Sequence, residues 1–172
     1  DAKTMGALIR SIADPAARDV VLVLVNDTEY GGSGHSRYSV ASVHALSVDL
    51  VLHELGHGFG LLNDEYAYEQ GPNCGTIGEI PSPNVTRVTV REQIKWNIWI
   101  HPATPVPTGG TANGIPGLYE GAAGCITGLY RPTYDSKMRG LNRPFEQINT
   151  EQLVKRIYNY VSPIDSVTPA VS

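Results

Sequence analysis

The sequence is poor in cysteine, in basic charge and in long apolar runs, and each shortage excludes a class of protein. Two cysteines in 172 residues are too few for a disulfide scaffold, and their spacing is not that of a CxxC metal knuckle. Thirteen basic against seventeen acidic side chains give a net charge of −4, which does not suit a nucleic-acid-binding domain. The longest apolar runs, such as Val20–Val25, are far shorter than the ~20 residues of a membrane-spanning helix.

What is present indicates one folded domain. The hydrophobic fraction of 41% is too high for a disordered chain, and the length fits a single domain over residues 1–172 with a tail from about 162. The chain begins at Asp1 with neither an initiator Met nor a signal peptide, which suggests a processed or excised protein. Its 18 glycines and 12 prolines exceed the ~12% that these residues usually make up, so we expect long, ordered loops.

Apolar periodicity predicts a mixture of helices and strands, and therefore an α+β fold. The clearest helix covers residues 47–59, and a second, amphipathic helix covers 150–161. The run Val20–Val25 predicts a strand that is buried on both faces. The other expected elements are a helix over 1–13, a loop over 30–35, an edge strand over 37–46, a short strand over 86–90, a short helix over 91–100, a loop over 101–117 and a hairpin over 118–130.

His53 and His57 form an HExxH sequence on the expected 47–59 helix. Residues i and i+4 lie on the same helix face, so their two imidazoles can bind one tetrahedral zinc ion. Glu54 stands beside the first histidine, where its carboxylate can take a proton from a zinc-bound water and deliver it to the leaving amine. The alternative is a helix with two surface histidines, which would not explain the glycine-rich sequence that follows.

A catalytic zinc site needs a third protein ligand and an open position for water. In the metzincin pattern HExxHxxGxxH/D, a glycine turns the backbone and the third ligand follows ten residues after the first histidine. Gly60 holds the glycine position, but the ligand position holds Asn63, which is a poor zinc ligand. We therefore expect Asp64 to be the third ligand, with Glu65 in reserve, although Asp64 could instead cap a turn.

The segment HELGHGFGLLNDEYAY at 53–68 resembles the IgA-peptidase family of zinc metallopeptidases, whose motif runs HExGHxFxxLxDEY. Weaker sequence similarity to the same family extends over about residues 20–160, in the segments 22–34, 84–100 and 128–158. The resemblance implies a metzincin-like domain, with a twisted mixed sheet behind the active-site helix and with a C-terminal helix. It also implies a secreted bacterial endopeptidase, and we expect an extended polypeptide substrate to run along an edge strand.

Three further residues are candidates on the same scheme. Metzincin-like enzymes place a methionine turn beneath the zinc site, and Met138 lies where that turn belongs, although it could be an ordinary core residue. Tyr66 is a candidate to stabilise the oxyanion. Arg139 could bind a carboxylate of the substrate, or could pair with Asp64 or Glu65 and support the metal site.

The cysteines and the other partners leave more alternatives open. Cys74 and Cys125 are expected to form a disulfide if the protein is secreted, but could also bind a metal or be free. We expect one catalytic zinc ion, and calcium in the acidic loops has no motif to support it. The domain is expected to be a monomer that binds no nucleic acid and contains no membrane span. His35, His44 and His101 have no ligand spacing and are expected at the surface or in the core.

The sequence therefore predicts a zinc-dependent endopeptidase that hydrolyses peptide bonds, on immunoglobulin or on other extracellular proteins. One alternative is a zinc peptidase or amidase that acts on cell-wall or small peptides. A second is a non-catalytic binding module derived from a protease. Retention of Glu54 argues against the binding module, because such modules most often lose the general base.

Overall fold

The computed structural model describes residues 20–35, 38–162 and 164. The helix expected over 1–13 and almost all of the expected tail after 162 lie outside the described residues. The described elements form an α+β arrangement of two sheets, two α-helices and two short 3-10 helices.

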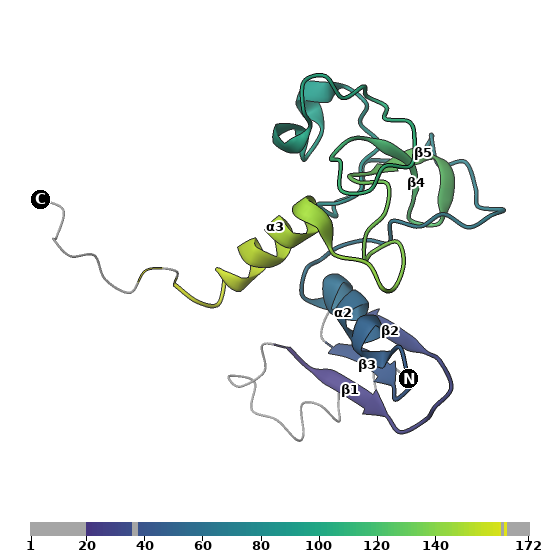
Figure 1. The fold of residues 1–172 in the computed structure, drawn as a ribbon, viewed down its shortest axis with the longest axis vertical. Coiled ribbons are helices and arrows are strands. Elements are labelled where there is room, and N and C mark those ends of the chain that lie inside the picture. Colours follow the sequence, from purple (N-terminus) through teal and green to yellow (C-terminus); the bar gives the residue numbers. More distant parts are fainter. Residues whose placement is uncertain (1–19, 36–37, 163, 165–172) are drawn as a thin grey trace, which may run out of the picture.

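A three-stranded mixed sheet and helix α2 form one half of the described chain (Figure 1). Strand β1 (Leu22–Val25) pairs in parallel with β3 (Tyr38–Ser42), and β3 pairs antiparallel with β2 (Gly32–His35). Helix α2 (Ser47–Gly58), which confirms the expected 47–59 helix, packs chiefly on β2 and β3. The sheet order β1-β3-β2 therefore leaves β2 as the edge strand that lies next to the helix.

Three expectations for this half were wrong. Residues 37–46 supply the central strand β3 and not an edge strand. Strand β1 is not buried on both faces, as the 59% exposure of Leu24 shows. The reason is that α2 covers the other two strands, β2 and β3. Residues 30–35 contain strand β2 and not only a loop, because the backbone pairs with β3 while α2 packs closely above. A Cβ added at Gly32 would lie 2.9 Å from the Leu50 Cδ2, so this strand is rich in glycine.

A hairpin and long irregular loops form the other half (Figure 1). Strand β4 (Tyr119–Ala122) pairs antiparallel with β5 (Cys125–Arg131), which confirms the hairpin expected over 118–130. The loop expected over 101–117 contains neither helix nor strand. The strand expected over 86–90 is reduced to a single bridge between Thr86 and Tyr130.

The tryptophan-bearing segment forms two 3-10 helices and not one short helix. These are η2 (Arg91–Gln93) and η3 (Asn97–Trp99). Trp96, between them, is 2% exposed and packs in a core cluster with Ile94, Ile100, Leu118 and Ile148. Trp99 is partly exposed and donates its indole N–H to Glu151 at 2.8 Å. Only the first tryptophan therefore belongs to the core.

Helix α3 (Glu146–Ile157) connects the two halves. Near its C-terminal end, Gln152 Nε2 donates to the Gly60 carbonyl at 3.0 Å and Arg156 Nε donates to the Phe59 carbonyl at 2.8 Å. Both carbonyls lie just beyond the end of α2. The helix starts earlier than the expected residue 150, since Asn149 is a buried residue of the helix. Neither described α-helix has the length and apolar character that crossing a bilayer requires.

A disulfide joins Cys74 and Cys125. It attaches the irregular segment after residue 71 to the first residue of β5, inside a core cluster with Val85, Ala122 and Leu129. The bond closes a separation of 51 residues. A cross-link of that span holds a loop-rich region together chiefly by restricting the unfolded chain.

Candidate metal centre

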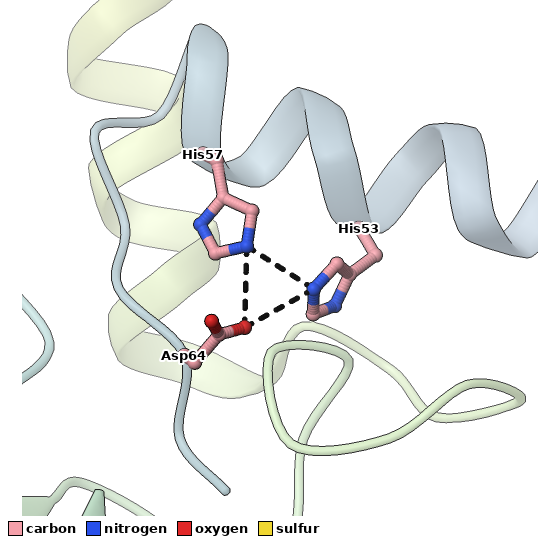
Figure 2. Close-up of side chains that lie close together, drawn as sticks. All are labelled: His53, His57 and Asp64. Carbon is pink, nitrogen blue, oxygen red and sulfur yellow. Dashed lines mark hydrogen bonds and ion pairs between the residues drawn. The ribbon is translucent and has the colours of Figure 1, made fainter. Parts of the chain in front are cut away.

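Two histidines of α2 and one aspartate of the following loop converge on one point, as Figure 2 shows. The Nε2 atoms of His53 and His57 lie 3.1 Å apart, and each lies 3.2 Å from Asp64 Oδ1. Three donor atoms at these separations fit around a single ion at zinc–ligand distances of ~2.0–2.2 Å. The described residues contain no other group of three histidine, cysteine, aspartate or glutamate side chains so arranged.

The turn after α2 brings the aspartate back toward the helix. The amides of Leu61 and Leu62 donate to the carbonyls of His57 and Gly56, and Leu61 has a positive φ of 57°. Gly60 is required at this close approach, because a Cβ there would lie 2.6 Å from the Gly56 carbonyl oxygen. In Figure 2 the chain then leaves the end of the helix on the side to which the two imidazoles point, and Asp64 faces both rings.

Backbone carbonyls fix the tautomer of both histidines. The Nδ1 of His53 lies 2.8 Å from the Lys137 carbonyl oxygen, and the Nδ1 of His57 lies 2.9 Å from that of Leu62. A carbonyl oxygen can only accept, so each Nδ1 carries the proton and each neutral ring has its lone pair on Nε2. Asp64 Oδ1 is buried and has no hydrogen-bond donor among the described residues. Three lone pairs thus face one another, which is the arrangement that a metal cation stabilises.

The cluster of His53, His57 and Asp64 favours binding of either a proton or a metal ion. Burial lowers the pKa of His57, but the Asp64 carboxylate 3.2 Å from its Nε2 and the Leu62 carbonyl beside its Nδ1 raise it by more, so the net shift is upward. Burial raises the pKa of Asp64, but the two imidazoles beside its carboxylate bring it well below its usual value. Either a proton or a metal ion can supply the charge that these three groups require.

The two alternative third ligands do not face the histidines. The Asn63 side chain accepts the Asp64 backbone N–H at 2.8 Å through its Oδ1. Glu65 is fully buried, and its carboxylate is engaged elsewhere. Of the three residues considered for the third position, the structure therefore places only Asp64 beside His53 and His57.

Glu65 forms a buried hydrogen-bond network that the sequence did not predict. Its Oε1 accepts from Asn84 Nδ2 at 2.9 Å and from Asn149 Nδ2 at 2.8 Å, while its Oε2 accepts from Ser136 Oγ at 2.6 Å. Burial raises the pKa of Glu65 more than these bonds lower it. The network connects the Asp64 loop to three segments that are distant in the sequence. The only sequence signal for it is that Glu65 is the glutamate of the DEY in the 53–68 motif.

Glu54 is 6% exposed and lies between α2 and the edge strand β2. A Cβ added at Gly34 of β2 would lie 2.8 Å from Glu54 Oε2 and 2.8 Å from His57 Cβ. Both side chains therefore lie close to the backbone of the strand. The backbone carbonyl of Glu54 also accepts a hydrogen bond from Ser39 Oγ, on β3, at 3.1 Å. The missing side chain at Gly34 thus allows the strand to pass directly over the helix.

Replacing Gly34 by alanine is therefore expected to lower the free energy of unfolding by about 1–3 kcal/mol, because the new methyl group overpacks this contact. Gly31 is the matched control, since a Cβ there meets nothing within 4 Å, and its alanine variant should stay within about 0.5 kcal/mol of the wild type. Urea denaturation followed by circular dichroism measures both. Equal stability of the two variants would contradict the packing described.

The turn at Met138 lies against the same helix. Met138 is fully buried, and its Sδ would lie 2.5 Å from a Cβ added at Gly56. Its carbonyl accepts the Glu65 N–H at 2.8 Å, and the preceding carbonyl, of Lys137, holds the His53 ring. The thioether packs against the helix, while the backbone of the turn orients one histidine and the aspartate loop.

The remaining candidates lie near the cluster, but one expected pairing is absent. Among the described residues Arg139 pairs with neither Asp64 nor Glu65 and instead contacts Tyr134, whose carbonyl accepts from Arg139 Nη1 at 2.8 Å. Burial, then a hydrogen bond to its neighbour Tyr68, then the negative charge of Asp64 raise the pKa of Tyr66. Tyr66 therefore lies close enough to Asp64 to sense its charge.

Comparison with known protein families identifies a match for this chain. A family model described as IgA Peptidase M64 matches residues 4–115. That segment contains His53, Glu54, His57 and Asp64, whereas Met138 and the segment 128–158 lie outside it. No curated protein matches the chain.

Proposed function

The chain belongs to the IgA peptidase M64 family, and on that premise we propose that it is a zinc-dependent endopeptidase. In this proposal His53, His57 and Asp64 hold the metal, and Glu54 is the general base and acid. Family membership supports a metallopeptidase, and the cluster of two histidines and one aspartate is compatible with a bound metal ion. The finer assignments rest on the geometry that follows.

The convergence of three unprotonated donor atoms carries the proposal. Two imidazole nitrogens and one carboxylate oxygen are a donor set that suits zinc and leaves a fourth position open. The buried Asp64 Oδ1, which receives no hydrogen bond from the described residues, fits a metal ligand better than a turn cap. When bound there, zinc would lower the pKa of a coordinated water to ~7 and polarise the scissile carbonyl.

The chain's own residues supply the proton transfers. Glu54 follows a proposed ligand on α2 and is buried, so its carboxylate can accept a proton from the attacking water and pass it to the leaving amine. Tyr66 carries its hydroxyl proton at neutral pH, as its upward-shifted pKa requires, and that hydroxyl can donate to the oxyanion. Packing against Gly34 limits the positions that the Glu54 side chain can adopt.

The substrate would bind in extended form along β2. Among the described strands β2 pairs only with β3, so its other edge offers backbone groups to a peptide. The strand also passes over Glu54 and His57, which would bring the peptide close to the metal centre. The disulfide between Cys74 and Cys125 supports an extracellular location, because such bonds persist in oxidising compartments.

Metal removal tests the proposed function. Purified protein is expected to contain about one zinc ion per chain and to digest casein, and a chelator should abolish the digestion. Added zinc should restore it, while added calcium alone should not. Elemental analysis and a fluorescent casein assay measure the two quantities. Protein without zinc, or digestion that is unchanged in chelator, would disprove the proposal.

A further inference from the structure

A polar cavity of about 610 Å³ lies beside the β4–β5 hairpin and the turn that follows β5. Its charged lining consists of Arg131, Arg139 and Arg143 against Glu120 and Asp135. Tyr66, which follows Asp64 closely in the chain, lines the cavity as well. The cavity thus carries an excess of positive charge and lies next to the proposed metal centre.

Two of these arginines have no carboxylate partner. Arg143 Nε pairs with Asp135 Oδ2 at 2.5 Å, so the positive charge of Arg143 is neutralised. Glu120 keeps its negative charge while its Oε1 accepts the Gly128 N–H at 3.0 Å, so three arginines face two carboxylates across the cavity. Arg131 and Arg139 are the two arginines of the lining that form no direct ion pair with the described residues.

The backbone holds both guanidinium groups in place. Arg131 Nε donates to the Tyr134 carbonyl at 3.1 Å, and its Nη1 donates to the carbonyls of Glu120 and Gly121. Arg139 Nη1 donates to the same Tyr134 carbonyl at 2.8 Å, and its Cζ lies 4.6 Å from the centre of the Tyr134 ring. Among the described residues, Nη2 of both arginines and Nε of Arg139 have no acceptor. Fixed arginines with free N–H groups are suited to bind a carboxylate.

The two like charges are close enough to act on each other. Burial, and then the positive charge of Arg139, lower the pKa of Arg131 to about 10, while the negative charges of Glu65 and Asp135 act in the opposite direction. Arg131 is only 5% exposed, so little water screens its charge. An anion that enters the cavity would remove this repulsion as well as gaining hydrogen bonds.

We propose that Arg131 and Arg139 form a carboxylate-binding subsite for the peptide substrate, which we call the arginine pocket. The carboxylate is either an acidic side chain near the scissile bond or the C-terminus of the peptide. The inference rests on the proposed peptidase function, because it assigns the substrate preference of that same site. It predicts that the enzyme selects peptides by negative charge.

The test uses matched fluorogenic peptides that differ in one residue. Glutamate and glutamine are compared at each position flanking the scissile bond, and a free C-terminus is compared with an amidated one. Hydrolysis gives kcat/KM for each peptide, and fluorescence anisotropy in chelator gives the affinity without hydrolysis. The wild type should prefer the carboxylate form about tenfold in one of the two series.

Arg139→Gln should reduce this preference toward one, in hydrolysis and in binding. Arg87→Gln is the matched control, because Arg87 is exposed, lies outside the cavity and also donates to a carbonyl, that of Gly75. It removes the same charge and should keep the preference. Wild-type protein without a preference in either series, or a preference that survives in Arg139→Gln, would overturn the pocket. A preference in binding without any hydrolysis would support the pocket and reject the peptidase proposal.

Discussion

Replacing Glu54 by glutamine is expected to reduce kcat/KM for peptide hydrolysis by about 100- to 10,000-fold, with the zinc content unchanged. The amide has the size of the carboxylate but cannot take a proton from water. The side chain lies against Gly34 and is not one of the three converging donor groups, so the metal should remain bound. A fluorogenic peptide assay and elemental analysis of the same sample measure the two effects.

Glu92→Gln is the matched control, because it replaces a glutamate by glutamine at an exposed position on η2, outside the cluster. It should keep wild-type activity. Full activity of Glu54→Gln would remove Glu54 from the proposed proton transfer. Loss of zinc together with activity would show that Glu54 maintains the ligand geometry, and would equally count against its role as the base.

Replacing Asp64 by alanine is expected to weaken zinc binding by more than about 100-fold and to abolish activity. Among the described residues the variant removes the one carboxylate that shares the three-residue cluster with the two histidines, and the loss should exceed the 10- to 100-fold typical of groups that merely support a ligand. Competition with a chromophoric chelator measures the affinity. The zinc-dependent rise in melting temperature should disappear in parallel, because binding to the native state produces it.

Two neighbouring variants separate a ligand from a supporting residue. Asn63→Ala removes one hydrogen bond to the Asp64 amide and should weaken zinc binding by less than about tenfold. Glu65→Ala should chiefly lower stability, since it leaves the buried Asn84 and Asn149 amides without their acceptor. If Asn63→Ala or Glu65→Ala lost more zinc affinity than Asp64→Ala, the ligand assignment would be wrong.

Features encoded within a few residues were predictable from the sequence. The i, i+4 histidines, the helix that carries them and the hairpin over 118–130 depend on local spacing, and the structure forms them. The structure also brings His53, His57 and Asp64 together, as the glycine and carboxylate after the helix suggested. The family predicted from the 53–68 motif is confirmed by the match over 4–115.

The features that failed depend on tertiary contacts. A glycine run such as 30–35 has low intrinsic strand preference, and only the close approach of α2 explains why it forms β2. The C-terminal helix was expected to begin at residue 150, but Asn149 lies inside α3, where its buried amide donates to Glu65. Of the two roles left open for Arg139, pairing with Asp64 or Glu65 is absent among the described residues, because the Tyr134 ring and carbonyl hold its guanidinium group at the cavity.

The supports of the metal cluster have a consequence for the order in which the site can mature during synthesis. His53 and the Lys137 carbonyl that orients it are 84 positions apart, and so are Glu65 and Asn149. During translation His53, His57 and Asp64 therefore emerge from the ribosome long before Lys137 and Asn149, whose groups support them. Until the residues around 137–149 have emerged and folded, the imidazoles lack their preset tautomer and the aspartate loop lacks its anchor. The segment around 137–149 thus completes the proposed metal site only after the ligand residues themselves have been made.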